Sequence, residues 1–212
     1  MDEIFSYGEK EMSYLSAKDK KLGAVIGKLG FIERAVIPDL FEALVNSIAG
    51  QQISSKALDT VWGRITERLS PITAEHFRGL SPEELTACGL SGRKAGYIIS
   101  AAEKFADGSI SAEELAKLPD EELIKRLISL DGIGRWSAEM LMLFSLRRQD
   151  ILSYGDFGIK RGLRMLYRHK QITPALFERY RKRFSPYGSV ASIYLWAVSA
   201  GAVEGLTDPA QR

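Results

Sequence analysis

Helical spacing of apolar residues along nearly the whole chain is the feature that most constrains the fold. Apolar side chains recur at the intervals of an α-helix, and runs of alternating β-branched residues are absent. Helix-start signals also repeat, with a capping residue before a proline or an acidic first turn. They stand at Ser81-Pro82, Ser111-Ala112, Pro119-Asp120 and Thr173-Pro174. The sequence therefore predicts an all-α fold of about a dozen short helices.

The links between these helices are short, and no low-complexity stretch or long flexible linker interrupts them. We therefore expect residues 1–212 to form a single compact unit. No run approaches the roughly 18 apolar residues of a membrane span. The start, Met1 to Ile4, lacks the basic and apolar character of a signal peptide. An intracellular protein without a membrane partner is expected.

Cysteine and histidine usage excludes several kinds of site. Cys88 is the only cysteine, so no intramolecular disulfide, cysteine-ligated iron–sulfur cluster or Cys-based zinc finger can form within the chain. His76 and His169 are far apart in the sequence and lack metal-ligand spacing, which favours solvated surface histidines.

The formal charge of +2 is too small to indicate a nucleic-acid partner by itself, but its distribution is uneven. Residues 145–184 hold eleven Lys and Arg against three acidic residues. Such a segment can meet a phosphate backbone, and it can equally be a solvated helix surface. Charge alone does not decide between the two.

The segment Leu130-Asp131-Gly132-Ile133-Gly134 lies between two predicted helices, 121–129 and 135–145. Two glycines one residue apart permit a tight turn and a close approach of the backbone. Because the second helix starts at once, free N–H groups point outward with the positive end of the helix dipole behind them. This is an anion site that suits a DNA phosphate, although glycines also serve helix–helix turns for geometry alone.

Asp156 lies about twenty residues further on, in Tyr154-Gly155-Asp156-Phe157-Gly158-Ile159, at a predicted helix start. A carboxylate there is held ionised by the helix dipole and free N–H groups. It can stabilise positive charge developing at C1′ of a deoxyribose and orient a water toward it. The plain alternative is that Asp156 is only an N-cap.

Hairpin, spacing and aspartate together resemble the helix-hairpin-helix (HhH-GPD) superfamily of DNA glycosylases, in which Asp131 here stands where proline is usual. The resemblance narrows to AlkA-type 3-methyladenine glycosylases, in a short form without their additional N-terminal domain. It spans roughly residues 40–200. The matching segments are 41–54, 89–98, the hairpin, the aspartate and 185–196.

The resemblance implies a monofunctional enzyme that flips an alkylated purine out of double-stranded DNA, hydrolyses its N-glycosidic bond and leaves an abasic site. Bifunctional relatives use a lysine nucleophile where this chain has Trp136. The missing lysine and the absent cysteine cluster weaken an adenine-mismatch or thymine-glycol glycosylase. A non-catalytic protein that grips distorted or branched DNA is the rival, disfavoured because Asp156 is retained.

The resemblance also assigns site residues. The catalytic carboxylate is Asp156, and the base pocket is Trp136, Trp196, Met140 (where tyrosine is frequent) and Gln52. The expected DNA contacts are Gly132, Gly134, Arg135, Ser137, Lys160, Arg161, Ser54, Leu90 and Ser91. The backbone carbonyls of Ile128, Leu130 and Ile133 would hold a monovalent Na or K ion. No dissociable organic cofactor is implied.

Two loops are candidates for the plug that fills the gap left by the flipped base: 51–55 and 90–92. Leu90 is the only large wedge at either tip, and Gln52 alternatively caps the helix that begins near Ser54.

The fold that this resemblance implies has two helical lobes flanking a DNA-binding cleft. One lobe covers about residues 41–150 with the hairpin at 130–134, and the other covers 1–40 plus 151–212. We expect a monomer, located in the cytoplasm with the nucleoid in a prokaryote or in the nucleus of a eukaryote.

Overall fold

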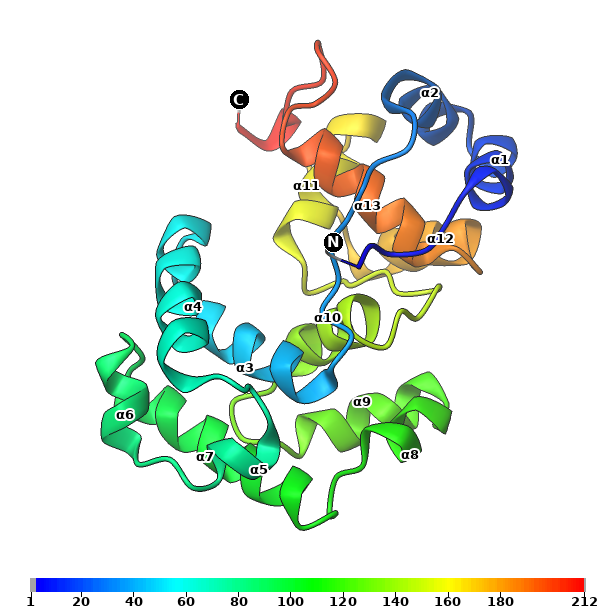
Figure 1. The fold of residues 1–212 in the computed structure, drawn as a ribbon. Coiled ribbons are helices and arrows are strands. Elements are labelled where there is room, and N and C mark those ends of the chain that lie inside the picture. The colour runs from blue at the N-terminus through cyan, green and yellow to red at the C-terminus, as the bar shows by residue number, and fades with distance from the viewer. Residues whose placement is uncertain (1–2, 212) are drawn as a thin grey trace. The chain divides into compact units, whose positions relative to one another are not determined.

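The computed structural model describes residues 3–211, and these residues are helical throughout apart from loops (Figure 1). They form thirteen α-helices and one 3-10 turn, and no β-strand is found among them. Within the described residues, one isolated antiparallel β-bridge pairs Ile4 with Ala35. The all-α prediction is confirmed.

The chain divides into two compact units. The first unit holds residues 1–36 and 147–212, and the second unit holds residues 37–146. The sequence placed these boundaries four residues further along. Two hydrogen bonds join residues 37–38 to the end of α10 (Arg135–Phe144) in the second unit. Ile37 N–H donates to the Phe144 carbonyl at 3.0 Å, and Ser145 Oγ donates to the Pro38 carbonyl at 3.2 Å.

The first unit consists of two N-terminal and three C-terminal helices plus the 3-10 turn. They are α1 (Glu9–Lys18), α2 (Lys20–Leu29), α11 (Phe157–Tyr167), α12 (Pro174–Phe184), α13 (Gly188–Ser199) and η1 (Pro209–Gln211). α11 and α13 pack side by side (Figure 1). Gly162 permits this contact, because a Cβ built there would lie 2.3 Å from the Leu195 carbonyl oxygen.

The second unit consists of eight consecutive helices. They are α3 (Leu40–Gly50), α4 (Ser55–Leu69), α5 (Ala74–Phe77), α6 (Pro82–Ala87), α7 (Gly92–Ala106), α8 (Ala112–Lys117), α9 (Asp120–Ile128) and α10 (Arg135–Phe144). α3 and α10 are the most apolar of these and are buried along most of their length. α7 packs against α3, α5 and α6, and α9 packs against α10.

The helix starts follow the sequence signals. Ser81 and Glu84 form a reciprocal capping box with Pro82 in the first turn of α6. Ser111 caps α8 by accepting from Glu114 N–H, and Thr173 caps α12 directly before Pro174. These local rules therefore decide where the helices begin.

Candidate active site and nucleic-acid contacts

Asp156 is the N-cap of α11 and is only 7% exposed. Its Oδ1 accepts two hydrogen bonds, from the Ile159 backbone N–H at 2.8 Å and from the Trp196 indole N–H at 3.0 Å. The positive end of the α11 dipole lies on the same side as these donors, so partial positive charges face the Asp156 side chain. The capping and carboxylate interpretations of Asp156 are thus compatible, because one side chain serves both.

Gly158 makes the bond between Asp156 and Trp196 possible. A Cβ at this position would lie 2.8 Å from Trp196 Cδ1 and 3.2 Å from Asp156 Oδ1. Any larger residue would therefore push the indole ring away from the carboxylate. The sequence motif contained this glycine but gave no indication of its contact with α13.

Trp196 is half-buried in α13, and a cationic side chain lies over its ring. The guanidinium carbon of Arg34 lies 5.5 Å from the ring centroid, in the range of a cation–π contact. The sequence assigned Trp196 to the base pocket by resemblance and did not indicate Arg34 at all. The structure adds that the indole N–H is directed at Asp156.

Two exposed aromatic residues flank Asp156 in the sequence. Phe157 is 66% exposed and lies 5.8 Å from the Arg164 guanidinium. Tyr154 is also exposed, and the Lys160 ammonium lies 4.9 Å from its ring centroid. The sequence-predicted DNA contact Lys160 therefore lies over the Tyr154 ring. Phe157 was missed because an aromatic residue after a helix cap carries no signal of exposure.

Arg161, a second predicted DNA contact on α11, is turned toward the C-terminal segment. Its Nη1 donates to the Ser199 carbonyl at 3.0 Å, and its Nε lies 3.7 Å from Asp208. Asp208 is buried and accepts a two-pronged hydrogen bond from Arg164, which holds the pKa of that carboxyl below its usual value. A DNA contact by Arg161 requires it to leave these partners.

The hairpin of the second unit has the predicted form, a tight turn between α9 and α10. Ile133 N–H donates to the Leu130 carbonyl at 3.1 Å, and Gly132 has a φ of +79°, a conformation that favours glycine. Tyr97 of α7 packs directly against Gly132, where an added Cβ would lie 2.3 Å from the ring. Asp131 accepts from Ser100 Oγ at 3.0 Å, which anchors the turn at the position where the family has proline.

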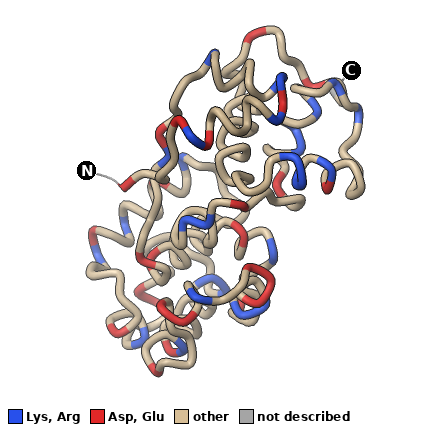
Figure 2. Tube along the Cα trace, turned by 90° about the vertical axis from the view of Figure 1, so that its right-hand side faces the viewer, with Lys and Arg blue, Asp and Glu red and all other residues tan. Residues whose placement is uncertain are grey.

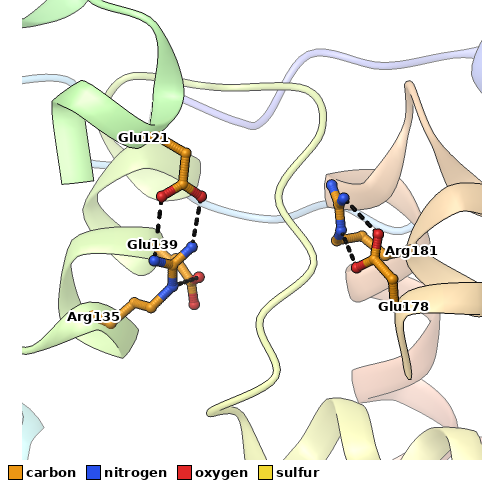
Figure 3. A network of polar contacts seen from close by, with 5 residues as sticks. All are labelled: Glu121, Arg135, Glu139, Glu178 and Arg181. Carbon is orange, nitrogen blue, oxygen red and sulfur yellow. Dashed lines mark hydrogen bonds and ion pairs between the residues drawn. The ribbon is translucent and has the colours of Figure 1, made fainter. Parts of the chain in front are cut away.

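The first turn of α10 carries the other hairpin residues. Trp136 is 44% exposed, whereas Ser137 and Met140 are buried. Arg135 forms ion pairs with Glu121 at 2.8 Å and with Glu139 at 3.1 Å (Figure 3). Of these predicted site residues, Trp136 is therefore the one whose side chain presents a large surface, and Arg135 is already paired with carboxylates.

The loop after α3 is fixed to the hairpin by contacts that the sequence did not predict. Gln51 Nε2 donates to the Gly132 carbonyl at 2.8 Å. Lys94 Nζ donates to the carbonyls of Ala49 at 2.9 Å and Gln51 at 2.8 Å, and burial lowers the pKa of this ammonium, with Arg93 adding to the effect. Gln52 is exposed with a φ of 58°.

The remaining predicted contacts lie at the starts of α4 and α7. Ser54 caps α4 by accepting from Ala57 N–H, and Ser91 caps α7 by accepting from Lys94 N–H, both at 3.3 Å. Gln52 therefore does not cap α4. Leu90 is buried and only 6% exposed, so the large wedge expected from the sequence is not presented at the surface; Ile53 is the exposed apolar residue of the other loop.

Alanine substitutions at the two hairpin glycines are expected to differ in their effect on stability, because Gly132 is sterically confined and Gly134 is not. Gly132→Ala should lower the free energy of unfolding by about 3 kcal/mol. Alanine disfavours the left-handed backbone conformation at this position, and its Cβ would clash with the Tyr97 ring. Gly134→Ala should lower the free energy of unfolding by about 1 kcal/mol or less, because no atom lies within 4 Å of the added Cβ. Urea unfolding of both variants measures the difference. Equal losses would contradict the hairpin geometry.

Other kinds of site find no support within residues 3–211. No group of three His, Cys, Asp or Glu side chains is placed to hold a metal ion. No helix in this part of the chain has the length and apolar character needed to cross a membrane.

Comparison with known proteins agrees with this geometry. Residues 45–186 match the model of the HhH-GPD superfamily base excision DNA repair proteins. DNA-3-methyladenine glycosylase 1 of Schizosaccharomyces pombe is 34% identical over 206 residues, which are 93% of this chain and 90% of that protein.

Two solved structures are similar over nearly their whole length. A DNA-3-methyladenine glycosidase from Bacillus halodurans has a TM-score of 0.81 and 34% identity, with 95% of each chain covered. A 3-methyladenine DNA glycosylase of S. pombe in complex with abasic DNA has a TM-score of 0.82 and 32% identity, covering 93% of this chain and 99% of that one. The chain belongs to the HhH-GPD superfamily of base excision DNA repair proteins.

Proposed function

We propose that this protein is a monofunctional DNA-3-methyladenine glycosylase, which excises alkylated purines such as 3-methyladenine and 7-methylguanine from double-stranded DNA. The observation that carries the proposal is the Asp156 carboxylate, buried at the start of α11 and held by two N–H donors. The similar glycosylases named above support the choice of substrate.

In the proposed reaction the carboxylate acts on the sugar rather than on the base. As the glycosidic bond lengthens, positive charge develops at C1′, and the negative charge of Asp156 stabilises it. The carboxylate also orients the water that attacks C1′. The Ile159 and Trp196 donors fix the carboxylate in position, so little reorganisation is needed during the reaction.

The proposed substrate matches the aromatic character of the assigned pocket residues. A purine alkylated at N3 or N7 carries positive charge, which indole faces bind by stacking and cation–π attraction. Trp136, which is 44% exposed, offers such a face, whereas the Arg34 guanidinium already lies over the ring of Trp196. The same charge weakens the glycosidic bond, so a general acid is not required.

Strand cleavage is not part of the proposed reaction. A lyase step needs an amine that attacks C1′ and forms a Schiff base. At the position of that lysine the chain has Trp136, whose indole nitrogen cannot act in this way. The proposed products are therefore a free base and an abasic site in an intact strand.

The carbonyls of Ile128, Leu130 and Ile133 would hold a monovalent cation at the hairpin. Ile128 is the last residue of α9, and Leu130 and Ile133 lie in the turn that follows it. Neutral carbonyl oxygens suit Na or K. The Leu130 carbonyl accepts one hydrogen bond, from Ile133, and a carbonyl has two lone pairs. The donor set therefore fits, and a bound cation would add positive charge where the hairpin N–H groups face a phosphate.

Trp196→Phe is expected to lower the single-turnover excision rate by about 10- to 100-fold, since it removes a hydrogen bond to a charged group. Trp62→Phe, in α4 of the second unit, is the matched control and should leave the rate within about twofold. A Trp196→Phe rate equal to that of the control would exclude a role for the indole N–H.

The lesion range tests the proposal directly. Because Leu90 is buried and Ile53 is the exposed apolar residue left in the two plug loops, we expect the protein to depend on lesions with weak glycosidic bonds. Release of 7-methylguanine should be faster than release of hypoxanthine or the neutral ethenoadenine from otherwise identical duplexes. Equal rates for these bases would overturn the proposed lesion preference, and tight binding of distorted duplexes without any release would indicate a binding protein instead.

A further inference from the structure

A cluster of aromatic rings lies at the C-terminal end of α11 in the first unit. The rings of Tyr167 and Tyr180 lie 4.5 Å apart between centroids. His169 follows α11, and its Nε2 lies 2.8 Å from the Tyr180 hydroxyl. Burial raises the pKa of Tyr180 to about 12, so both tyrosines stay neutral under ordinary conditions. Tyr167 and Tyr180 therefore form an uncharged aromatic pair.

Positively charged groups from two other helices lie over this aromatic pair. The Lys21 ammonium of α2 lies 5.6 Å from the Tyr167 centroid, and the Arg183 guanidinium of α12 lies 5.3 Å from the Tyr180 centroid. Burial lowers the pKa of His169, and the nearby charges of Lys21 and Arg179 lower it further. We call Lys21, His169, Arg179 and Arg183 the basic surface.

Two carboxylates next to members of the basic surface, Asp19 and Glu178, already have partners. Asp19 is buried and accepts from Arg183 at 2.7 Å; burial alone would raise its pKa, but hydrogen bonds from Leu22 and Arg183 hold it below its usual value. Glu178 is paired with Arg181 at 2.7 Å (Figure 3).

Two members of the basic surface keep uncompensated charge. Lys21 and Arg179 form no ion pair within the part of the chain that the structure describes. Figure 2 marks where Lys, Arg and the acidic residues stand along the chain. The charges of Lys21 and Arg179 both act on His169, and an anion supplied from outside the protein would offset them.

The surface lacks the apolar residues that the core of a protein interface requires. The large exposed apolar side chains of the described residues are Ile4, Phe31, Ile53, Ile128, Trp136, Tyr154 and Phe157. None of them belongs to α2 or α12. Positive charge without exposed apolar side chains suits a phosphate backbone better than a protein surface.

The basic surface is separate from the candidate catalytic carboxylate. Asp156 precedes α11, whereas His169 follows it. A helix of this length places its two ends about 15 Å apart. A phosphate that contacts the basic surface is therefore not the one next to the flipped nucleotide.

We propose that the basic surface binds a second segment of nucleic-acid backbone, outside the segment that presents the damaged base to Asp156. The proposal rests on the proposed function only in that the protein binds DNA. Its role would be to hold the protein on long DNA, because sequence-independent phosphate contacts raise affinity without contributing to base recognition.

The salt dependence of DNA binding tests the proposal. Duplexes of about 12 and about 40 base pairs, one helical turn and several, are titrated with the wild type and with Lys21→Gln/Arg179→Gln. On the longer duplex the variant should lower the slope of log K against log salt by about 1.8, near 0.9 for each lost phosphate contact. On the shorter duplex, which offers fewer phosphates within reach of the basic surface, the slope should change less.

The matched control is Lys10→Gln/Lys117→Gln, which removes the same charge from exposed positions in α1 and α8. A slope on the longer duplex that is the same for both double variants would overturn the proposal. Single-turnover excision from the short duplex is measured in parallel and should stay at the wild-type rate. Failure of the proposed function would abolish that excision in the wild type itself, so the two failures are distinguishable.

The two histidines give a second measurement that needs no variant. Adding the longer duplex should raise the pKa of His169 in an NMR titration, because phosphates offset the charges of Lys21 and Arg179. The ring resonances of His76, in α5 of the second unit, should not respond to the duplex. A rise of the His169 pKa with a glutamate-rich peptide but not with DNA would overturn the proposal in favour of an acidic protein partner.

Discussion

Asp156→Asn is expected to slow base excision by about 100- to 1,000-fold while the protein stays folded and still binds DNA. Asparagine caps helices as well as aspartate does, and its amide oxygen can accept the same bonds from Ile159 and Trp196. The substitution therefore removes the negative charge and little else. Single-turnover excision and DNA affinity measure the two effects separately.

This variant also separates the two roles of Asp156. If the side chain were only an N-cap, asparagine would replace it without loss of activity. Asp39→Asn, at the N-cap of α3, is the matched control and should leave excision unchanged. DNA affinity of the Asp156 variant should stay the same or increase, because a carboxylate repels phosphate. Wild-type rates in Asp156→Asn would leave the protein without its proposed catalytic group.

Gly162→Ala is expected to lower the free energy of unfolding of the first unit by about 3 kcal/mol. The added Cβ would meet the Leu195 carbonyl oxygen at 2.3 Å, and backbone cannot turn aside as a side chain can. α11 and α13 must therefore move apart. Since Asp156 starts α11 and Trp196 lies on α13, excision should fall in the fraction of protein that remains folded.

The control for this substitution is Gly27→Ala in α2 of the same unit, where nothing lies within 4 Å of the added Cβ. Alanine there should raise stability by about 0.5 to 1 kcal/mol, the usual gain inside a helix. Urea unfolding followed by circular dichroism gives both values. Similar stability for the two variants would show that α11 and α13 are not packed at Gly162.

Much of the fold could be predicted from local sequence rules. Capping residues at Ser81 and Thr173 mark true helix starts, and the glycine spacing at 132 and 134 marks the hairpin. Asp156 was also identifiable, because both its capping position and its distance from the hairpin are properties of the chain in order. Membership of the HhH-GPD superfamily is confirmed by the family match.

The side-chain contacts between distant segments could not be predicted. Lys94 holds the loop after α3 through two carbonyls, and Arg34 covers Trp196 from a segment more than a hundred residues away. Such contacts depend on how helices pack, which no periodicity or motif encodes. For the same reason the burial of Leu90, the wedge predicted from its loop, could not be predicted from the sequence.

Asp131 shows how a departure from a motif can be compensated elsewhere. Its replacement of proline removes a fixed φ from the hairpin. In the structure Ser100 of α7 donates to its carboxylate, and Tyr97 of the same helix packs on Gly132. The turn is thus supported from α7, a segment thirty residues away that the hairpin sequence itself does not reveal.

The most direct test of the account follows the fate of methylated duplex DNA incubated with wild-type protein and with Asp156→Asn. Freed bases are identified, and strand integrity is measured before and after alkali. The account predicts release of methylpurines by the wild type, loss of that release in the variant, and strand breaks only after alkali. Release by the variant at the wild-type rate, or strand breaks without alkali, would contradict it.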